Sequence, residues 1–161
     1  SYRLTGWPVG SAAGPFNLIN AMYKVQSQNV SSTASISMAA SVEALNGDQS
    51  FINSNNESFL RRRNLVVKNL NETPGLSCRT PEGAFYVFAS CKGILGKKTE
   101  TGKVLDTDGD FMDYLLEEVG VAGVQGSAFG LDGFFRISYA TSDSILEDAC
   151  QRIKKACSKL S

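Results

Sequence analysis

Residues 134–140 of the chain read FFRISYA, a short aromatic and apolar run with one arginine near its centre. Such a run is typical of a β-strand, in which successive side chains point to opposite faces of the sheet. Alternation separates two sets of side chains, Phe135, Ile137 and Tyr139 on one face and Phe134, Arg136 and Ser138 on the other. We therefore predict a strand over residues 134–139 that carries a charged group among apolar neighbours.

Arg136 is the most informative single residue of this strand. A guanidinium keeps its charge at physiological pH, and burying it without a partner costs several kcal/mol. It therefore requires an anion, for which the strand leaves two interpretations open. One is a structural salt bridge to an internal Asp or Glu, and the other is the carboxylate of a ligand, held by two parallel hydrogen bonds. The residues alone favour neither.

Helices and short strands surround this segment. The predicted strands cover residues 76–78, 84–88, 121–124 and 134–139, and residues 9–14 are strand-like. The predicted helices cover residues 16–25, 34–46, 48–71 and 111–119, and a run after Ser142. Residues 31–33 and Asp48 are the expected N-caps of the second and third helices, and residues 93–110 are expected to form a long mobile loop. This order predicts an α+β layer, a small sheet with helices packed on it.

A glycine-bracketed turn, GSAFG, occupies residues 126–130 between two of these strands. Two glycines permit a tight backbone path, which could bring the chain close to a bound molecule. The simpler interpretation is a hairpin-like connection. The spacing is not that of a nucleophile elbow, because the serine follows the first glycine directly.

The composition excludes several classes of function. The chain has 161 residues, and sixteen Lys and Arg balance sixteen Asp and Glu, whereas a nucleic-acid-binding protein normally carries a basic excess. The arginines at 61–63 fan around a helix turn, so we expect a solvated face with one or two local ion pairs. No apolar run approaches the roughly 18 residues that span a bilayer, and no signal-peptide pattern opens the chain. We expect a cytoplasmic protein that binds neither nucleic acid nor membrane.

Histidine is absent, which excludes Ser-His-Asp hydrolysis, Cys-His proteases and His-ligated metal sites. The cysteines at 78, 91, 150 and 157 form no C-x-x-C pair, and we expect reduced thiols, although Cys78 and Cys91 could face each other across a hairpin. Residues 106–110, DTDGD, resemble the start of a calcium loop but lack the glutamate at its twelfth position. We therefore expect no metal site.

Several motifs together resemble one known family. In chain order they are YRLTGWPVGSAAGP at 2–15, a segment from Ser27-Gln28 to Ala44-Leu45, the arginine pair at 62–63, PEGAFY at 81–86, GSAFG at 126–130 and RISYA at 136–140. Their order and spacing resemble the class I pyridoxal-phosphate aminotransferases, most closely the bacterial aspartate aminotransferase branch. The resemblance covers essentially the whole chain.

The resemblance implies the α/β architecture called fold type I, of which this chain would form the C-terminal part. Residues 1–50 would be the C-terminal end of the large cofactor-binding domain, and residues 51–161 the small α+β C-terminal domain. Arg136 matches the family's arginine for the α-carboxylate of the substrate, an amino acid or a 2-oxo acid. The cofactor would be pyridoxal 5′-phosphate. Family members are usually homodimers, and residues 27–33 resemble a segment that approaches the neighbouring active site.

Two departures limit what the resemblance transfers. The family's Schiff-base lysine would lie immediately before Ser1, so the chain holds no catalytic residue, and we expect it alone to be inactive and not to retain the cofactor. Pro8 occupies the position where the family usually has a phosphate-binding arginine, and a proline offers neither charge nor a backbone N–H. The chain also lacks an initiator Met, and we expect it to be the rear part of a longer protein.

Two alternatives remain open on the same residues. The first is a noncatalytic or degenerate protein of this fold that acts only in assembly, which Pro8 and the missing lysine favour. The second is a pyridoxal-phosphate-dependent carbon–sulfur lyase, because the same scaffold and the same arginine serve both reactions.

Overall fold

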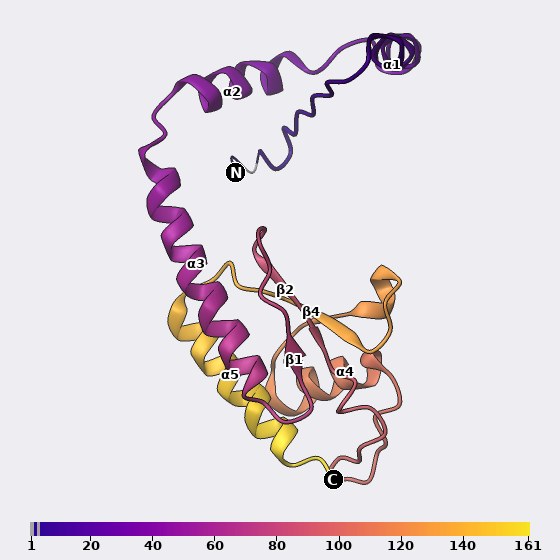
Figure 1. The fold of residues 1–161 in the computed structure, drawn as a ribbon, viewed down its shortest axis with the longest axis vertical. Coiled ribbons are helices and arrows are strands. Elements are labelled where there is room, and N and C mark those ends of the chain that lie inside the picture. The colour runs from indigo at the N-terminus through magenta and orange to yellow at the C-terminus, as the bar shows by residue number, and fades with distance from the viewer. Residues whose placement is uncertain (1, 3) are drawn as a thin grey trace. The chain divides into compact units, whose positions relative to one another are not determined.

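The computed structural model describes Tyr2 and residues 4–161, and the chain divides into two units (Figure 1). The first unit ends at Ser54 and the second runs from Asn55 to Ser161. Helix α3 (Ser50–Asn71) contributes residues to both. Among the described residues, no helix combines the length and the apolar character needed to span a membrane.

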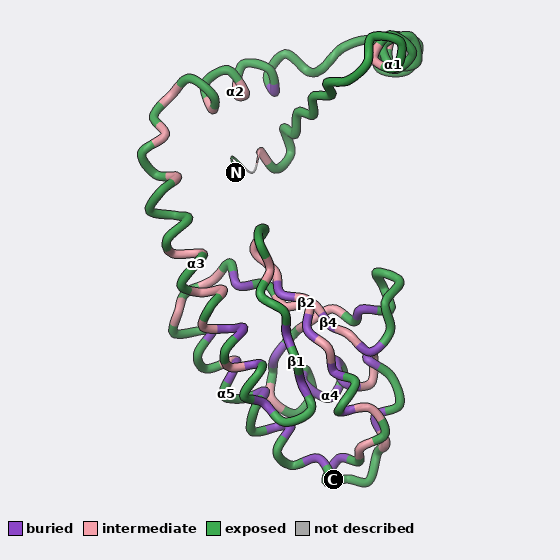
Figure 2. The backbone as a smooth tube through the Cα atoms, viewed as in Figure 1, coloured by how far each residue is buried: buried purple, intermediate pink, exposed green. Residues whose placement is uncertain are grey.

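The first unit contains α1 (Phe16–Asn29) and α2 (Ser35–Asn46). α1 buries none of its residues, and the only buried residue of α2 is Ser37. Large apolar side chains of both helices are exposed instead, among them Phe16 at 80% and Leu45 at 68%, and the trace is almost entirely of exposed residues here (Figure 2). Exposed apolar surface of this extent marks an interaction site. The described residues of this unit therefore form no apolar core of their own.

Two predictions for the first unit are wrong. Residues 9–14 form no strand, because a strand needs a neighbour for its backbone N–H and C=O groups and no described segment pairs with them. The N-cap of α2 is Ala34, with no side-chain capping bond, and not residues 31–33. Asp48 lies two residues before the start of α3, one residue before the N-cap position, and its carboxylate still accepts bonds from the Ser50 N–H at 2.9 Å and the Ser50 hydroxyl at 2.6 Å.

The second unit is built on one antiparallel sheet. Its strands, in spatial order, are β1 (Ser77–Cys78), β2 (Tyr86–Ser90), β4 (Phe134–Ser138) and β3 (Val124–Gln125). β4 is paired on both sides. The prediction for β4 is confirmed together with its alternation, because Phe135 and Tyr139 are buried whereas Arg136 is only half-buried.

Two other strands differ from their predicted bounds. β2 begins at Tyr86 and not at residue 84, because Ala84 has a left-handed backbone with φ of 64° that interrupts an extended chain. β3 is limited to two residues. Its expected first residue, Val121, instead donates its N–H to the Leu115 carbonyl at 3.1 Å, which ties it to the end of the preceding helix.

Three helices supply the rest of the core of the second unit. They are the C-terminal part of α3, α4 (Asp108–Val119) and α5 (Asp143–Ser158). The best-buried apolar side chains, each at most 1% exposed, come from these helices and the sheet and include Val66, Leu70, Val87, Phe111, Leu115, Phe135, Tyr139 and Ile153. This arrangement is the predicted α+β layer, in which helices cover the apolar face of a small sheet (Figure 1).

Residues 93–110 are more ordered than expected. Ile94 and Leu105 are fully buried, and the Lys98 N–H donates to the Ser161 carbonyl at 2.9 Å. The expectation of a long mobile loop is wrong, because single buried residues anchor this segment. Its sequence shows no periodicity that would reveal them.

The acidic residues at 106–110 serve the start of α4. Thr107 is its N-cap: the Thr107 hydroxyl accepts the Asp110 N–H at 3.1 Å, and the Asp110 carboxylate accepts the Thr107 N–H at 2.9 Å. This reciprocal pair is a capping box, and it explains why the helix begins at Asp108 and not at the predicted residue 111.

All four cysteines are free, buried thiols. Cys78 lies opposite Ala89 and not Cys91, so a bridge between Cys78 and Cys91 across the hairpin is ruled out as an interpretation. Burial raises the pKa of Cys78, Cys91 and Cys150 to about 11 and that of Cys157 to about 12. Thiols with such values stay protonated at physiological pH and are poor nucleophiles.

Candidate functional site

Arg136 lies at the centre of β4, the best-paired strand of the sheet. It is opposite Phe88 of β2 and Val124 of β3. Because both neighbouring strands are hydrogen-bonded to β4, the backbone that carries the guanidinium is fixed. The position is therefore a rigid platform for a charged group.

Two aromatic rings flank the Arg136 guanidinium. Its Cζ atom lies 4.5 Å from the ring centroid of Tyr86 and 4.5 Å from that of Phe129, over the face of each ring. Tyr86 belongs to β2, and Phe129 belongs to a short 3₁₀ helix, η1 (Gly126–Phe129), that follows β3. Since β4 lies between β2 and β3, the two rings reach the cation from opposite sides of its strand. A ring face attracts a guanidinium electrostatically.

No protein carboxylate pairs with this guanidinium among the described residues. Every ion pair found within residues 4–161 joins other cations to other acids. The Arg136 guanidinium also donates no hydrogen bond to a described residue. The internal salt bridge, one of the two interpretations of the sequence, is therefore absent from the described part of the chain.

The geometry leaves the in-plane N–H groups of Arg136 for a ligand. A guanidinium has five N–H donors in one plane, and no described residue accepts a hydrogen bond from those of Arg136. Two parallel N–H groups match the two oxygens of a carboxylate. The arrangement can therefore bind a planar carboxylate in the plane of the guanidinium.

η1 is held in place by a buried acid. The Asp108 side chain is 3% exposed, and its Oδ2 atom accepts the Ser127 N–H at 2.7 Å. Phe129 at the end of η1 packs edge-on against Phe88, with ring centroids 6.1 Å apart, and Phe88 in turn stacks on Phe134 at 5.6 Å. Asp108 and these rings together fix the side of the site that Phe129 forms.

Packing and backbone conformation within the protein account for both glycines of the turn. At Gly126 a Cβ atom would lie 2.8 Å from both the Cβ and the carbonyl oxygen of Phe134, and it would also meet the Leu131 carbonyl oxygen. Gly130 has φ of 78°, in the region that favours glycine. The turn therefore holds η1 against the start of β4.

We expect Gly126→Ala to destabilise the second unit by about 1–3 kcal/mol, because the added methyl group would force the turn away from β4. Urea unfolding, followed by far-ultraviolet circular dichroism, measures this loss of stability. Gly83→Ala is the matched control, since no atom lies within 4 Å of a Cβ added there. Equal stability of the two variants would contradict the tight packing of the turn.

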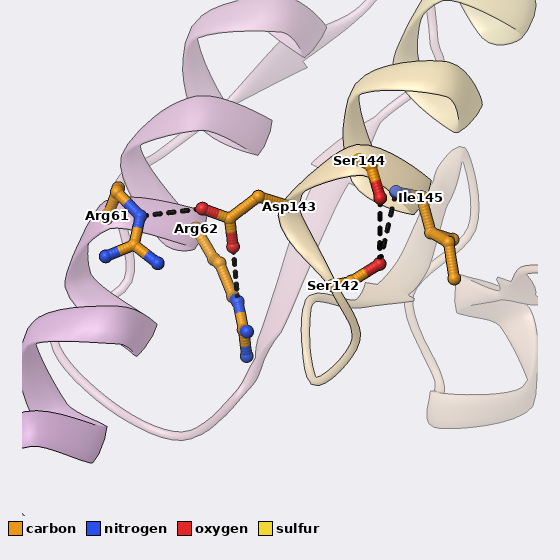
Figure 3. A network of polar contacts seen from close by, with 6 residues as sticks. All are labelled: Arg61, Arg62, Ser142, Asp143, Ser144 and Ile145. Atoms are coloured by element: carbon orange, nitrogen blue, oxygen red, sulfur yellow. Dashed lines mark hydrogen bonds and ion pairs between the residues drawn. The ribbon is translucent and has the colours of Figure 1, made fainter.

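The three arginines of α3 pair with distant residues. Arg61 Nε lies 2.6 Å and Arg62 Nε 2.7 Å from the two carboxylate oxygens of Asp143, the first residue of α5 (Figure 3). Arg63 donates to the Pro81 carbonyl at 3.1 Å. The prediction of local ion pairs was wrong, because the acid partner is 82 residues from Arg61 and is brought there by the packing of α5 beside α3.

This double pair fixes the start of α5, which directly follows the strand that carries Arg136. Ser142 is the N-cap of α5, and its hydroxyl accepts the Ile145 N–H at 3.4 Å (Figure 3). Hydrogen bonds from Arg61 and then Arg62 lower the pKa of Asp143 to about 2 from its usual 3.8.

We expect the Asp143 carboxylate to stay ionised at pH 3, where an ordinary aspartate is mostly protonated. A lowered pKa in the folded state means that the pair stabilises fully above about pH 4 and loses this effect as the pH falls through about 2. Carboxyl ¹³C NMR of the chain measures the titration. A midpoint near 3.8 for Asp143, or no change in it in an Arg61→Gln, Arg62→Gln variant, would contradict the pairing.

Pro8 lies in the first unit and is exposed, in a segment whose local order is a turn closed by the Trp7 N–H to the Leu4 carbonyl at 2.8 Å. It supplies no donor and no charge, and its described neighbours from Leu4 to Gly10 are all uncharged. The described residues around Pro8 therefore do not fit a phosphate group.

Sequence reasoning singled out Arg136 but not the residues around it. Tyr86 belongs to the motif PEGAFY and Phe129 to GSAFG, yet only the pairing of β4 with β2 and with β3 brings the two rings to the guanidinium. In the sequence, Asp108 stands out only as part of an acidic run. The role of an acid at the start of a helix follows from its burial in the structure, and the spacing of residues in the sequence does not show that burial.

Comparison with known proteins gives one family. The family model described as aminotransferase class I and II matches residues 1–153. The chain is 58% identical over 161 residues to an aspartate aminotransferase of Rhizobium meliloti (strain 1021), covering all of this chain and 39% of the relative. It is 51% identical to a probable aspartate/prephenate aminotransferase of Rickettsia prowazekii, covering 99% of this chain and 40% of the relative. The chain thus spans about two fifths of the length of these relatives.

Solved structures agree with this result. The aspartate aminotransferase of Rhizobium meliloti superimposes with a TM-score of 0.89 at 59% identity, over 99% of this chain and 40% of that one. The aspartate aminotransferase of Thermus thermophilus with maleate superimposes with a TM-score of 0.79 at 35% identity, over 95% of this chain and 38% of that one. The predicted fold, the C-terminal part of an α/β fold type I aminotransferase, is confirmed.

Proposed function

The chain belongs to the class I and II aminotransferase family, and from that premise we propose that the whole protein transfers an amino group between an amino acid and a 2-oxo acid. Aspartate is the proposed amino donor, because relatives 58% and 55% identical to the chain carry the name aspartate aminotransferase. The chain itself would supply the carboxylate-binding side of the active site.

One observation carries this proposal: Arg136 is half-buried on a rigid strand, flanked by two rings, and has no carboxylate partner among the described residues. Its in-plane donors would hold the α-carboxylate of each substrate in turn. Binding at two oxygens fixes the orientation of the attached Cα atom, which is the positioning that the reaction requires.

The proposed cofactor of the whole protein is pyridoxal 5′-phosphate, which family membership supports. The residues around Pro8 do not fit its phosphate, so its main contacts would come from parts of the protein that this chain does not include. No step of the reaction is therefore assigned to residues of this chain other than substrate binding by Arg136.

The proposed organisation follows the family. Residues 1–50 would be the end of the large domain and residues 51–161 the small domain, a boundary supported by the division of the chain at Ser54. The proposed assembly is a cytoplasmic homodimer. Its support is the exposed apolar surface of α1 and α2, which a partner would cover.

The direct test uses the full-length protein with pyridoxal phosphate, aspartate and 2-oxoglutarate. The expected result is oxaloacetate and glutamate in equal amounts, and a visible absorbance band that borohydride abolishes while fixing the cofactor to a lysine. Release of pyruvate and ammonia from a cysteine-type substrate, without amino transfer, would instead indicate a lyase. No band and no product would indicate the noncatalytic alternative, which Pro8 favours.

We expect Pro8→Arg to tighten cofactor binding by the full-length protein about ten- to a hundredfold, because a charged hydrogen bond to a phosphate is worth about 1.5–3 kcal/mol. Pro8→Gln is the matched control, since it restores the backbone N–H without the charge. Equilibrium dialysis against the cofactor measures both. If Pro8→Arg binds no better than the parent protein, position 8 does not lie at the phosphate.

A further inference from the structure

We propose that Tyr139 is a positioning residue for substrate binding: its hydroxyl holds the turn at residues 81–85, and this turn places the ring of Tyr86 beside Arg136. The inference rests on the proposed function, in which Arg136 binds the α-carboxylate of the substrate. It goes further by assigning a role to a buried side chain on the opposite face of the sheet from Arg136.

The turn at residues 81–85 has a backbone conformation that its sequence does not favour. Ala84 has φ of 64°, in the left-handed region where the Cβ atom of a residue other than glycine is crowded. Ala84 is also exposed, so burial of its own methyl group does little to offset the strain. Such a conformation persists only where the surrounding contacts hold the backbone in place.

Two hydrogen bonds from Tyr139 hold this turn. The Tyr139 hydroxyl donates to the Ala84 carbonyl at 3.1 Å, and the Tyr139 N–H donates to the Phe85 carbonyl at 2.9 Å. These two carbonyls belong to the left-handed residue and to the residue that links it to β2. A further bond, from Arg63 of α3 to the Pro81 carbonyl at 3.1 Å, holds the start of the turn.

Tyr139 is itself firmly anchored. Its side chain is 1% exposed, and its ring packs edge-on against that of Phe59 of α3, with centroids 6.2 Å apart. Its backbone directly follows β4, the strand that is paired on both sides. The hydroxyl therefore presents a donor at a fixed point to an exposed and strained turn.

The conformation of the turn sets the position of Tyr86. Tyr86 is the first residue of β2 and directly follows Phe85, and its ring centroid lies 4.5 Å from the Cζ atom of Arg136. A change of backbone conformation at Ala84 would therefore displace this ring from the guanidinium. An arginine side chain that has lost such a neighbour has more rotamer freedom to lose when it binds a carboxylate, so its affinity falls.

Tyr139→Phe removes the hydroxyl and keeps the ring, so the variant is expected to fold. Tyr114→Phe is the matched control: Tyr114 is also buried, at 6% exposed, and its hydroxyl donates to the Ala156 carbonyl at 3.2 Å. That bond joins α4 to α5 and involves neither the turn nor Arg136. A loss of stability alone would affect the two variants alike.

The kinetic measurement uses the full-length holoenzyme with aspartate. In Tyr139→Phe we expect KM for aspartate to rise about two- to tenfold, the range of one lost intramolecular hydrogen bond, with kcat nearly unchanged. Tyr114→Phe is expected to leave KM unchanged. Amide hydrogen exchange of residues 84–86 is a second readout that does not depend on activity, and it is expected to be faster by a similar factor in Tyr139→Phe only.

Ala84→Gly tests the role of the strained turn, because glycine adopts the left-handed conformation without crowding. If the hydroxyl holds a strained backbone, its removal has less effect once the strain is gone. The rise in KM caused by Tyr139→Phe is therefore expected to be at most half as large in the Ala84→Gly background as in the parent protein. Equal rises in both backgrounds would show that the two residues act independently, which would overturn the proposal.

The outcomes distinguish this proposal from the proposed function. If Arg136→Lys leaves KM for aspartate unchanged, the proposed function of Arg136 fails. If Arg136→Lys raises KM but Tyr139→Phe leaves either KM or the exchange of residues 84–86 unchanged, only the positioning role is overturned. An equal rise of KM in Tyr114→Phe would also overturn that role, because the effect would then be a general loss of stability.

Discussion

Arg136→Lys in the full-length protein is expected to raise KM for aspartate about a hundred- to a thousandfold. A lysine keeps the positive charge but offers no planar pair of N–H groups, so the bidentate bonds to the carboxylate are lost. Hydrogen bonds to charged groups are worth about 1.5–3 kcal/mol each, so loss of two costs about two to four powers of ten in affinity, of which the charge that lysine keeps offsets a part. Steady-state kinetics with aspartate and with 2-oxoglutarate measure the change, which is expected for both substrates.

Arg152→Lys is the control for this experiment. Arg152 is a half-exposed arginine of the same unit that pairs with Asp148 at 2.6 Å within α5, and its replacement is expected to leave KM unchanged. Equal KM values for Arg136→Lys and the parent protein would remove Arg136 from the substrate site.

Phe135→Ala is expected to lower the free energy of unfolding of the second unit by about 3–5 kcal/mol, the range for truncating a fully buried phenylalanine. Phe135 is 0% exposed and packs edge-on against Phe111 of α4, with ring centroids 5.6 Å apart. The truncation would leave a cavity where the central strand meets α4. Because a domain of this size is stable by only about 5–15 kcal/mol, the variant is expected to be partly unfolded at 37 °C.

Urea unfolding of the chain, followed by circular dichroism, measures this loss. Leu116→Ala is the control, since Leu116 also lies on α4 but is 54% exposed, and its replacement is expected to change stability by less than about 1 kcal/mol. A loss below about 1 kcal/mol for Phe135→Ala would place the core of the unit elsewhere.

The regular elements of this chain were accessible from the sequence because their signals are local. The alternation of residues 134–139 fixed β4 and both of its faces, and Asp48 marked the start of α3. The ends of β2 and β3 were not accessible, because they depend on the left-handed backbone of Ala84 and on the bond of Val121 to Leu115. These are backbone conformations that residue type does not dictate.

Interactions between distant segments were missed for the same reason. The pairing of Arg61 and Arg62 with Asp143 requires α3 and α5 to be packed together first. The strand expected at residues 9–14 is a second example. Its residues suit a strand, but no described segment pairs with them and no strand forms. Local patterns thus predict which segments are regular, and partners decide whether they become so.

Prediction of the candidate site has the same limit, because local patterns indicate the residue but not its partners. The isolated charge in FFRISYA pointed to Arg136 and to its need for an anion, but not to which anion. The choice between an internal acid and a ligand depends on what tertiary packing places beside the guanidinium, and packing places two rings there and no described acid.

The most direct test of the assignment is a crystal structure of the full-length protein with maleate, the compound named with the solved Thermus thermophilus relative. The expected result is one carboxylate of maleate with its two oxygens about 3 Å from two nitrogen atoms of Arg136, in the plane of the guanidinium and between the rings of Tyr86 and Phe129. An Arg136 side chain paired with a protein carboxylate, with maleate bound elsewhere, would contradict it.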